Sequence, residues 1–85
     1  MTIGKFIDFG DWDLFDGLIM VMGKVFYSAD DDYDWDIIWK GVGDPQSTIP
    51  NDIKNYPIEF YRVYGDPTAP GGLQLQFYCD VAVED

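Results

Sequence analysis

Five aspartates lie within seven residues near the middle of the chain, in the segment Asp30-Asp31-Asp32-Tyr33-Asp34-Trp35-Asp36. In an extended strand, side chains alternate between two faces with a period of two residues. The aspartates at even positions then share one face: Asp30, Asp32, Asp34 and Asp36. The large apolar residues at odd positions share the other face: Tyr33, Trp35, Ile37 and Trp39. A row of carboxylates on an aromatic wall can attract a basic partner or ligate a hard cation.

The calcium interpretation of this row fails at two diagnostic places. If Asp30 is the first residue of an EF-hand loop, position six is Trp35, where the sharp turn requires Gly. Position twelve is Gly41, where a bidentate Glu is required. We therefore expect no dedicated metal site and no cofactor, and a weak Ca²⁺-binding domain is kept as an alternative function.

Nucleophilic catalysis lacks its usual base, because the chain contains no histidine. Paired carboxylates could serve a glycosidase, which needs two acids about 5–10 Å apart. A chain this short offers little material for a concave site around such a pair. The only cysteine, Cys79, lies among apolar residues of a strand, which indicates an inert core thiol. We expect the protein not to be an enzyme.

The net charge of −11, from 16 acidic and five basic residues, is large for 85 residues. Self-repulsion of this size costs stability, whereas a basic partner turns it into attraction. Direct binding to nucleic acid or to an anionic membrane needs the opposite sign and is disfavoured. A second acidic cluster, Asp11, Asp13 and Asp16, lies in the same half of the chain as the first.

Composition predicts a folded domain in a reducing compartment. Aromatic residues make up 18% of the chain, which supplies core material and argues against disorder. A single cysteine allows no intramolecular disulfide, and we find no signal-peptide or membrane-spanning pattern. We expect one domain, residues 1–85, in the cytoplasm, and in the host cytoplasm if a phage encodes it.

The first third of the chain allows two interpretations. Residues 3–9 alternate imperfectly and predict a first strand. Two turn dipeptides, Asp16-Gly17 and Gly23-Lys24, bracket an apolar run, which favours strand-turn-strand over 18–28 with a short helical turn at 11–16. Apolar residues at three- and four-residue steps keep a helix around 11–26 as the alternative.

The remaining elements follow from alternation and turn residues. The acidic row leads into a strand that continues to Trp39, with a helix as the weaker alternative. Residues 41–55 form a long connection, in which prolines exclude a regular helix of any length. Residues 58–64 predict a strand with Ile58, Phe60, Arg62 and Tyr64 on one face.

The clearest pattern lies at the end of the chain. Apolar residues occupy every odd position from Leu73 to Val83, and mostly polar residues occupy the even positions. This pattern predicts a half-buried antiparallel strand that forms a hairpin with 58–64. The fold class is therefore mainly β: a single small antiparallel sheet or partly open barrel with one short helix at most. The alternative is an α+β fold with a helix around 11–26.

In size, charge and aromatic content the chain resembles small phage-encoded anti-defence proteins, such as anti-CRISPR proteins and DNA-mimicking inhibitors. The resemblance is one of composition and involves no motif. It implies an inhibitor that occupies the basic nucleic-acid-binding surface of a nuclease or similar effector. The expected contact residues are those of the two acidic segments: Asp30, Asp31, Asp32, Tyr33, Asp34, Trp35, Asp36, Asp11, Asp13 and Asp16. The alternative from another class is an immunity-type or regulatory module that binds through shape and aromatic anchors.

Overall fold

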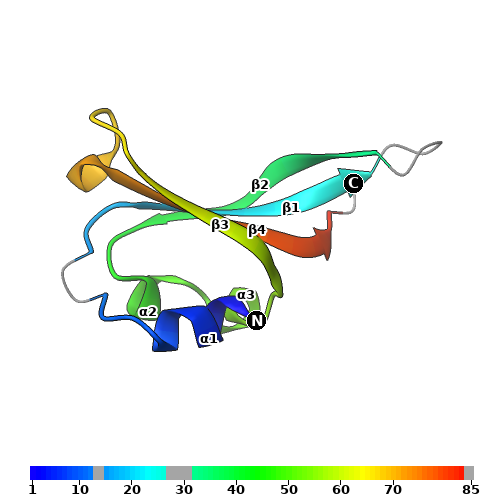
Figure 1. The fold of residues 1–85 in the computed structure, drawn as a ribbon, viewed down its shortest axis with the longest axis horizontal. Coiled ribbons are helices and arrows are strands. Elements are labelled where there is room, and N and C mark those ends of the chain that lie inside the picture. Colours follow the sequence, from blue (N-terminus) through cyan, green and yellow to red (C-terminus); the bar gives the residue numbers. More distant parts are fainter. Residues whose placement is uncertain (13–14, 27–31, 84–85) are drawn as a thin grey trace.

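A computed structural model describes residues 1–12, 15–26 and 32–83. Four strands form one sheet: β1 (Leu18–Phe26), β2 (Tyr33–Val42), β3 (Ile58–Gly65) and β4 (Leu73–Ala82). Three short helices cover one face of this sheet (Figure 1): α1 (Ile3–Asp8), α2 (Pro45–Thr48) and α3 (Asn51–Lys54). A single 3₁₀ turn, η1 (Pro70–Gly72), lies in the connection between β3 and β4.

The strand order is β2-β1-β4-β3, so β1 and β4 are central and β2 and β3 form the edges. The pairs β1–β2 and β3–β4 are antiparallel, whereas β1 and β4 run parallel. The connection from β2 to β3 passes beneath the sheet through α2 and α3, and the chain then returns as β4 beside β1 (Figure 1). The mainly β prediction is confirmed; the expected antiparallel sheet is mixed, because of this one central pair.

The core lies between the sheet and the helices. The apolar odd positions of β4 face it, as the alternation predicted, and Leu75, Phe77 and Cys79 have no exposed surface. Ile19 and Val21 of β1 lie beside them and are also fully buried. The helices and the residue that follows α2 complete this core with four isoleucines: Ile3, Ile7, Ile49 and Ile53.

The strand predicted over residues 3–9 is wrong, because this segment forms α1. Thr2 caps the helix, since its hydroxyl accepts a hydrogen bond from the Lys5 N–H at 3.3 Å. Ile3 and Ile7 stand four residues apart, which places both on the face that meets the core. Two isoleucines at this spacing outweigh the imperfect alternation of the segment.

The hairpin predicted over 18–28 and the alternative helix over 11–26 are both wrong, because Leu18–Phe26 forms one continuous strand. Gly23 lies inside this strand rather than in a turn. A Cβ atom at this position would lie 2.7 Å from the side chain of Val83, so the glycine permits a close approach of the chain end. Before the strand, the Phe15 N–H donates to the Trp12 carbonyl, and residues 13–14 of the predicted helical turn at 11–16 lie outside the described part.

The connection over 41–55 contains two helices of one turn each, which sequence reasoning had excluded. Asp44 caps α2, because its carboxylate accepts a hydrogen bond from the Gln46 N–H at 2.9 Å. Pro45 is the first residue of α2 and Pro50 precedes α3, where a missing N–H costs nothing. The prolines therefore start these helices and limit their length.

Two irregularities change which face a strand residue occupies. Val21 pairs with Trp39 and Met22 pairs with Ile37, so Ile38 is an extra residue in β2. Trp39 consequently packs against the core, which corrects the prediction that it shares a face with Trp35.

A second irregularity lies at the start of β3. Ile58 pairs with Cys79 and Phe60 pairs with Tyr78, which leaves Glu59 as an extra residue. Ile58 therefore packs against the core instead of sharing a face with Phe60, as the alternation had predicted. The strand itself and its hairpin with β4 are confirmed.

Candidate functional site

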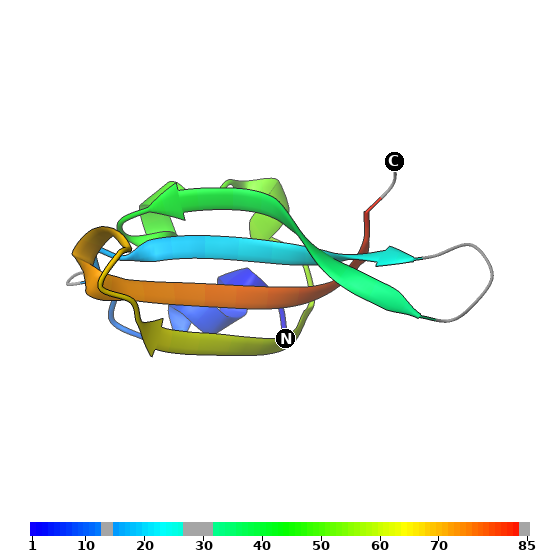
Figure 2. The ribbon, with the colours of Figure 1, turned by 90° about the horizontal axis from the view of Figure 1, so that it is seen from above.

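The open face of the sheet carries a cluster of aromatic rings at one end of the molecule. The hairpin of β1 and β2 is strongly twisted, and Figure 2 shows β2 crossing over the end of β1. This crossing brings Trp35 of β2 to 5.1 Å from Tyr78 of β4 and 5.7 Å from Phe60 of β3, measured between ring centroids. Phe60 and Tyr78 are stacked with centroids 4.3 Å apart. The cluster thus joins three strands above the sheet.

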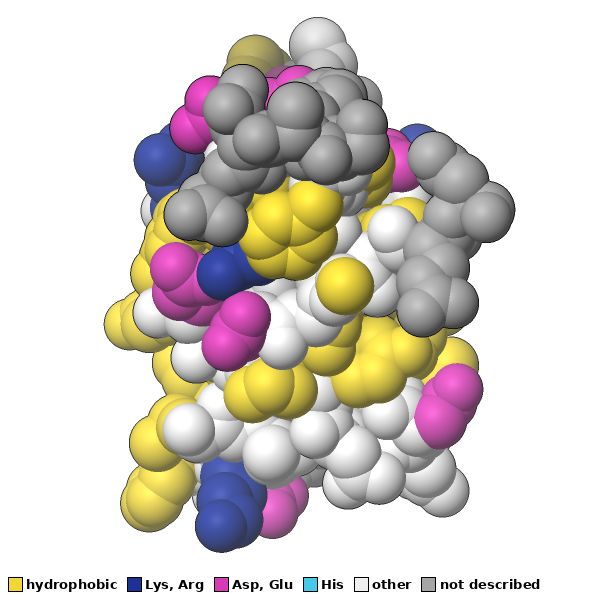
Figure 3. Space-filling model, turned by 90° about the vertical axis from the view of Figure 1, so that its right-hand side faces the viewer, with side chains coloured by type: hydrophobic (Ala, Val, Ile, Leu, Met, Phe, Trp, Pro, Cys, Tyr) yellow, Lys and Arg dark blue, Asp and Glu magenta, His cyan; other side chains and the backbone are white. Residues whose placement is uncertain are grey.

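Lys24 holds the acidic and aromatic parts of this end together. Its Nζ lies 2.6 Å from a carboxylate oxygen of Glu59 and 3.2 Å from one of Asp80. The same atom lies 4.6 Å from the ring centroid of Tyr33, which is a cation–π distance. Hydrogen bonding to Glu59, followed by the hydrogen bond and charge of Asp80, raises the pKa of Lys24 against the opposing effect of desolvation. Figure 3 shows acidic and basic side chains close together among hydrophobic ones at this end.

A row of polar side chains continues along the open face from the aromatic cluster. Gln76 is buried at 7% exposure, and its Nε2 donates to the Tyr64 hydroxyl at 2.8 Å. The Tyr78 hydroxyl donates to the Oε1 of Gln76, and the Tyr64 hydroxyl donates to Gln74. Each buried polar group of this row therefore has a hydrogen-bond partner, and these bonds hold the side chains of the row in one arrangement.

The predicted acidic row lies along the outer edge of the sheet, as far as the structure describes it. Asp32, Asp34 and Asp36 are exposed, at the start of β2 and within it, whereas Asp30 and Asp31 lie outside the described residues. Because β2 is an edge strand, these exposed residues lie at the boundary of the sheet. Tyr33 and Trp35 alternate with them and are partly buried against Lys24 and Tyr78.

The second predicted acidic cluster lies at the other end of the molecule. Asp11 and Asp16 are exposed before the start of β1, and Asp13 lies outside the described residues. Asp34 pairs with Val25, seven residues along β1 from Leu18, which corresponds to a separation of about 23 Å. The fold does not bring the two acidic clusters together.

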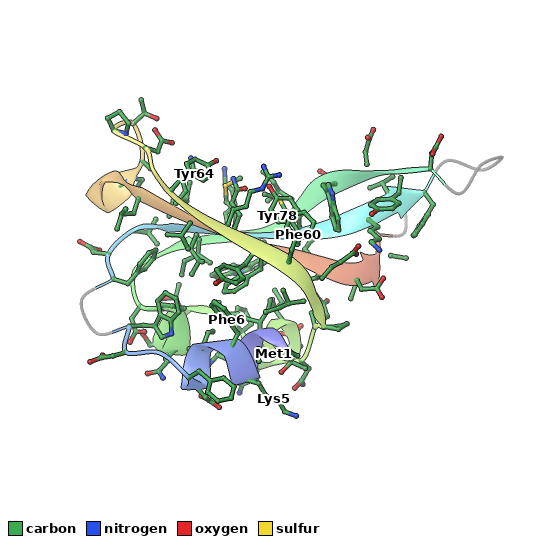
Figure 4. The ribbon with its side chains drawn as sticks, in the orientation of Figure 1. Met1, Lys5, Phe6, Phe60, Tyr64 and Tyr78 are labelled. Atoms are coloured by element: carbon green, nitrogen blue, oxygen red, sulfur yellow. The ribbon has the colours of Figure 1, made fainter. Side chains whose placement is uncertain are left out.

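One hollow lies beside the edge strand β3. It has a volume of about 380 Å³, and its lining is mostly apolar: Met1, Phe6, Ile58, Glu59, Phe60 and Tyr61. Figure 4 shows Phe6 reaching up from α1 toward the sheet, with Phe60 and Tyr78 above it. The hollow contains one carboxylate, and that group is engaged by Lys24. It is suited to an apolar side chain and offers no catalytic pair.

The cysteine lies in the core, and its environment fixes its chemistry. Cys79 is fully buried, and desolvation raises the pKa of its thiol to about 11, as expected for a core cysteine. Within the described part of the chain, no three acidic, cysteine or histidine side chains are grouped so that they could hold a metal ion. None of the helices described here is long and apolar enough to cross a bilayer.

Sequence reasoning missed Lys24, Phe60, Tyr78 and Gln76 as a connected surface. Lys24 follows a glycine and was assigned to a turn, and the even positions of β4 were expected to face solvent. A signal was present in the aromatic residues at even positions, Phe60 and Tyr78, which are unusual on a solvated face. Comparison of the sequence with models of protein families, with curated proteins and with solved structures found no match.

Proposed function

We propose that the protein is a non-enzymatic inhibitor that binds the basic, nucleic-acid-binding surface of a larger protein through the acidic edge of β2. The observation that carries the proposal is the exposure of Asp32, Asp34 and Asp36 along an edge strand. Same-face residues of a strand recur at about 6.6–6.8 Å, which is comparable to the spacing of phosphates along a nucleic-acid strand. The net charge of −11 favours a fast encounter with such a surface.

Lys24, the cation of the open-face cluster, is engaged by Glu59 and Asp80 rather than by Asp32 or Asp36. The aromatic side chains behind the edge, Tyr33 and Trp35, pack against the sheet and hold the strand in place. The edge therefore presents its carboxylates from a supported strand, which lowers the cost of ordering them on binding. An anti-defence role in a host cytoplasm is the context that the compositional resemblance suggests.

The test compares two double variants of equal charge. One changes Asp32 and Asp36 to Asn, and the control changes Asp8 and Asp52 to Asn, because these two residues are exposed elsewhere on the surface. Immobilised wild-type protein is exposed to a bacterial lysate at low salt, and captured basic proteins are identified as they elute with rising salt. We expect the β2 variant to lose the captured basic proteins and the control to retain them. We also expect the wild-type protein to displace a captured nuclease or effector from duplex DNA. Equal capture by the β2 variant would refute the proposal.

A second candidate function rests on the open face. Phe60 and Tyr64 are 37% and 43% exposed beside the aromatic cluster, and aromatic residues in such positions anchor protein interfaces. A module that binds through them would show weak salt dependence. It would also lose its partner in Phe60→Ala or Tyr64→Ala and keep it in the β2 aspartate variant.

A further inference from the structure

The outer edge of β3 is the second free edge of the sheet, and it differs in character from the edge of β2. Between Phe60 and Tyr64 it carries one charged residue, Arg62. Tyr61 and Val63 are 51% and 50% exposed on it. Edge strands normally avoid association by carrying charges, bulges or covering loops. This stretch of β3 lacks such protection, whereas β2 has Asp34 and Asp36.

The backbone groups of this edge can be assigned from the ladder that β3 forms with β4. The Asp66 N–H donates to the Gly72 carbonyl at 2.9 Å, just beyond the end of β3. Because antiparallel ladders alternate, the even-numbered residues of β3 from Phe60 onward direct their N–H and C=O groups toward β4, whereas the extra residue Glu59 turns the Ile58 N–H outward to Met1. Tyr61 and Val63 then direct theirs outward. Residues 1–2 occupy the same edge only at its start, where Met1 accepts a hydrogen bond from Ile58 and Thr2 forms a bridge with Pro57.

We propose that β3 pairs antiparallel with β3 of a second copy of this chain, which joins two sheets into one across a twofold axis at Tyr61. Tyr61 then exchanges hydrogen bonds with its counterpart, and Val63 lies opposite Glu59, the extra residue in β3 of the other copy. Arg62, whose guanidinium already lies over the rings of Phe60 and Tyr78 in its own chain, then also faces Phe60 of the other copy. The neighbouring registers are less favourable. An axis at Arg62 would place two guanidinium groups opposite each other, and an axis at Val63 would place the apolar Phe60 opposite the charged Asp66.

The hollow beside β3 supports the axis at Tyr61. Tyr61 lines it together with Phe6 on the helix side of the sheet. In the proposed register, Tyr61 and Val63 of the second copy lie on this same side and can cover the hollow. Extended chains that add to a sheet edge use such hollows to hold alternate side chains. The second copy of β3 thus meets both the outward backbone groups of this edge and the hollow beside it.

The net charge does not prevent this association. Asp34 and Asp36 belong to the other edge strand, and at physiological ionic strength the repulsion between exposed charges is largely screened beyond about 8 Å. A pairing of one short strand lies at the low end of interface size, and we expect a dimer with micromolar affinity.

Sedimentation equilibrium from low micromolar to near-millimolar concentration tests the association, with charge variants to test the register. Tyr61→Glu and Tyr61→Lys each place two like charges opposite each other at the twofold axis, and we expect both to weaken the dimer about tenfold. The matched controls are Val42→Glu and Val42→Lys, because Val42 is 47% exposed on the other edge strand.

Hydrogen exchange supplies a second measurement that needs no variant. The amide protons of Tyr61 and Val63 become protected as concentration rises, whereas that of Arg62 is protected throughout by its bond to β4. A single monomeric mass over the whole concentration range would overturn the proposal. So would equal effects of the two glutamate variants, or a Tyr61 amide whose exchange ignores concentration.

Discussion

Trp35 of β2 lies edge-on against Tyr78 of β4, with ring centroids 5.1 Å apart and an interplanar angle of 79°, although β1 lies between these two strands in the sheet. The contact exists because the twisted hairpin carries the first half of β2 over the open face (Figure 2). It accounts for the burial of Tyr78, which is 9% exposed on a face that carries no helix. The strand that carries the acidic edge is therefore fixed to the sheet by an aromatic side chain.

Removing this side chain should destabilise the whole fold. We expect Trp35→Ala to lower the free energy of unfolding by about 2–3 kcal/mol, because three ring contacts and partial burial are lost. Trp35→Phe should cost less, since one ring is retained. Urea denaturation followed by circular dichroism measures both values.

The control for Trp35 is Phe9→Ala, because Phe9 is 82% exposed. Its effect should stay within about 0.5 kcal/mol. If Trp35→Ala were no more harmful than Phe9→Ala, the contact between Trp35 and Tyr78 would not hold β2 to the sheet.

Sequence reasoning predicted the elements whose hydrophobic period is simple. The odd positions of β4 alternate without interruption, and Leu75, Phe77 and Cys79 are buried as that pattern requires. The Pro/Gly-rich segment before β4 likewise predicted its hairpin with β3. Both features depend on neighbouring residues, so one sequence is sufficient to find them.

The features that were missed depend on partners far away in the sequence. Nothing local to Trp39 shows that an extra residue, Ile38, shifts the register and turns this ring to the core. Gly23 resembles a turn residue until Val83 is placed against it. The continuous strand β1 also separates the two acidic clusters, which lie in the same half of the sequence.

Lys24 should stabilise the fold through charge rather than through its apolar stem. We expect Lys24→Met, which keeps most of the stem, to lower the Tm by a few degrees at neutral pH, because Glu59 and Asp80 lose their shared cation. The raised pKa of Lys24 fixes the sign of the pH dependence. Its contribution is fully present below the ordinary value of 10.5 and is lost as the pH rises through the higher folded value.

The control for Lys24 is Lys40→Met, which makes the same charge change on an exposed residue of β2. Thermal melts at low and high salt compare the two variants. The deficit of Lys24→Met should shrink with salt and exceed that of Lys40→Met. A Tm equal to that of wild type would show that this cation adds nothing to the fold.

Cys79 should make the protein less stable in alkaline solution. Burial raises the pKa of its thiol from an ordinary value of 9.0 to about 11, so the unfolded chain releases the proton first. The free energy of unfolding is unaffected by this group below pH 9.0 and decreases as the pH rises from there to about 11. Cys79→Ala lacks this titration, so the stability difference between wild type and variant should shrink over that range. Urea denaturation of both proteins at several pH values measures this difference, and the contributions of the other titrating groups cancel in it.

Two outcomes would contradict the burial of Cys79. One is a stability difference that stays constant with pH, and the other is a thiol that reacts rapidly with a disulfide reagent in the folded state at about pH 8.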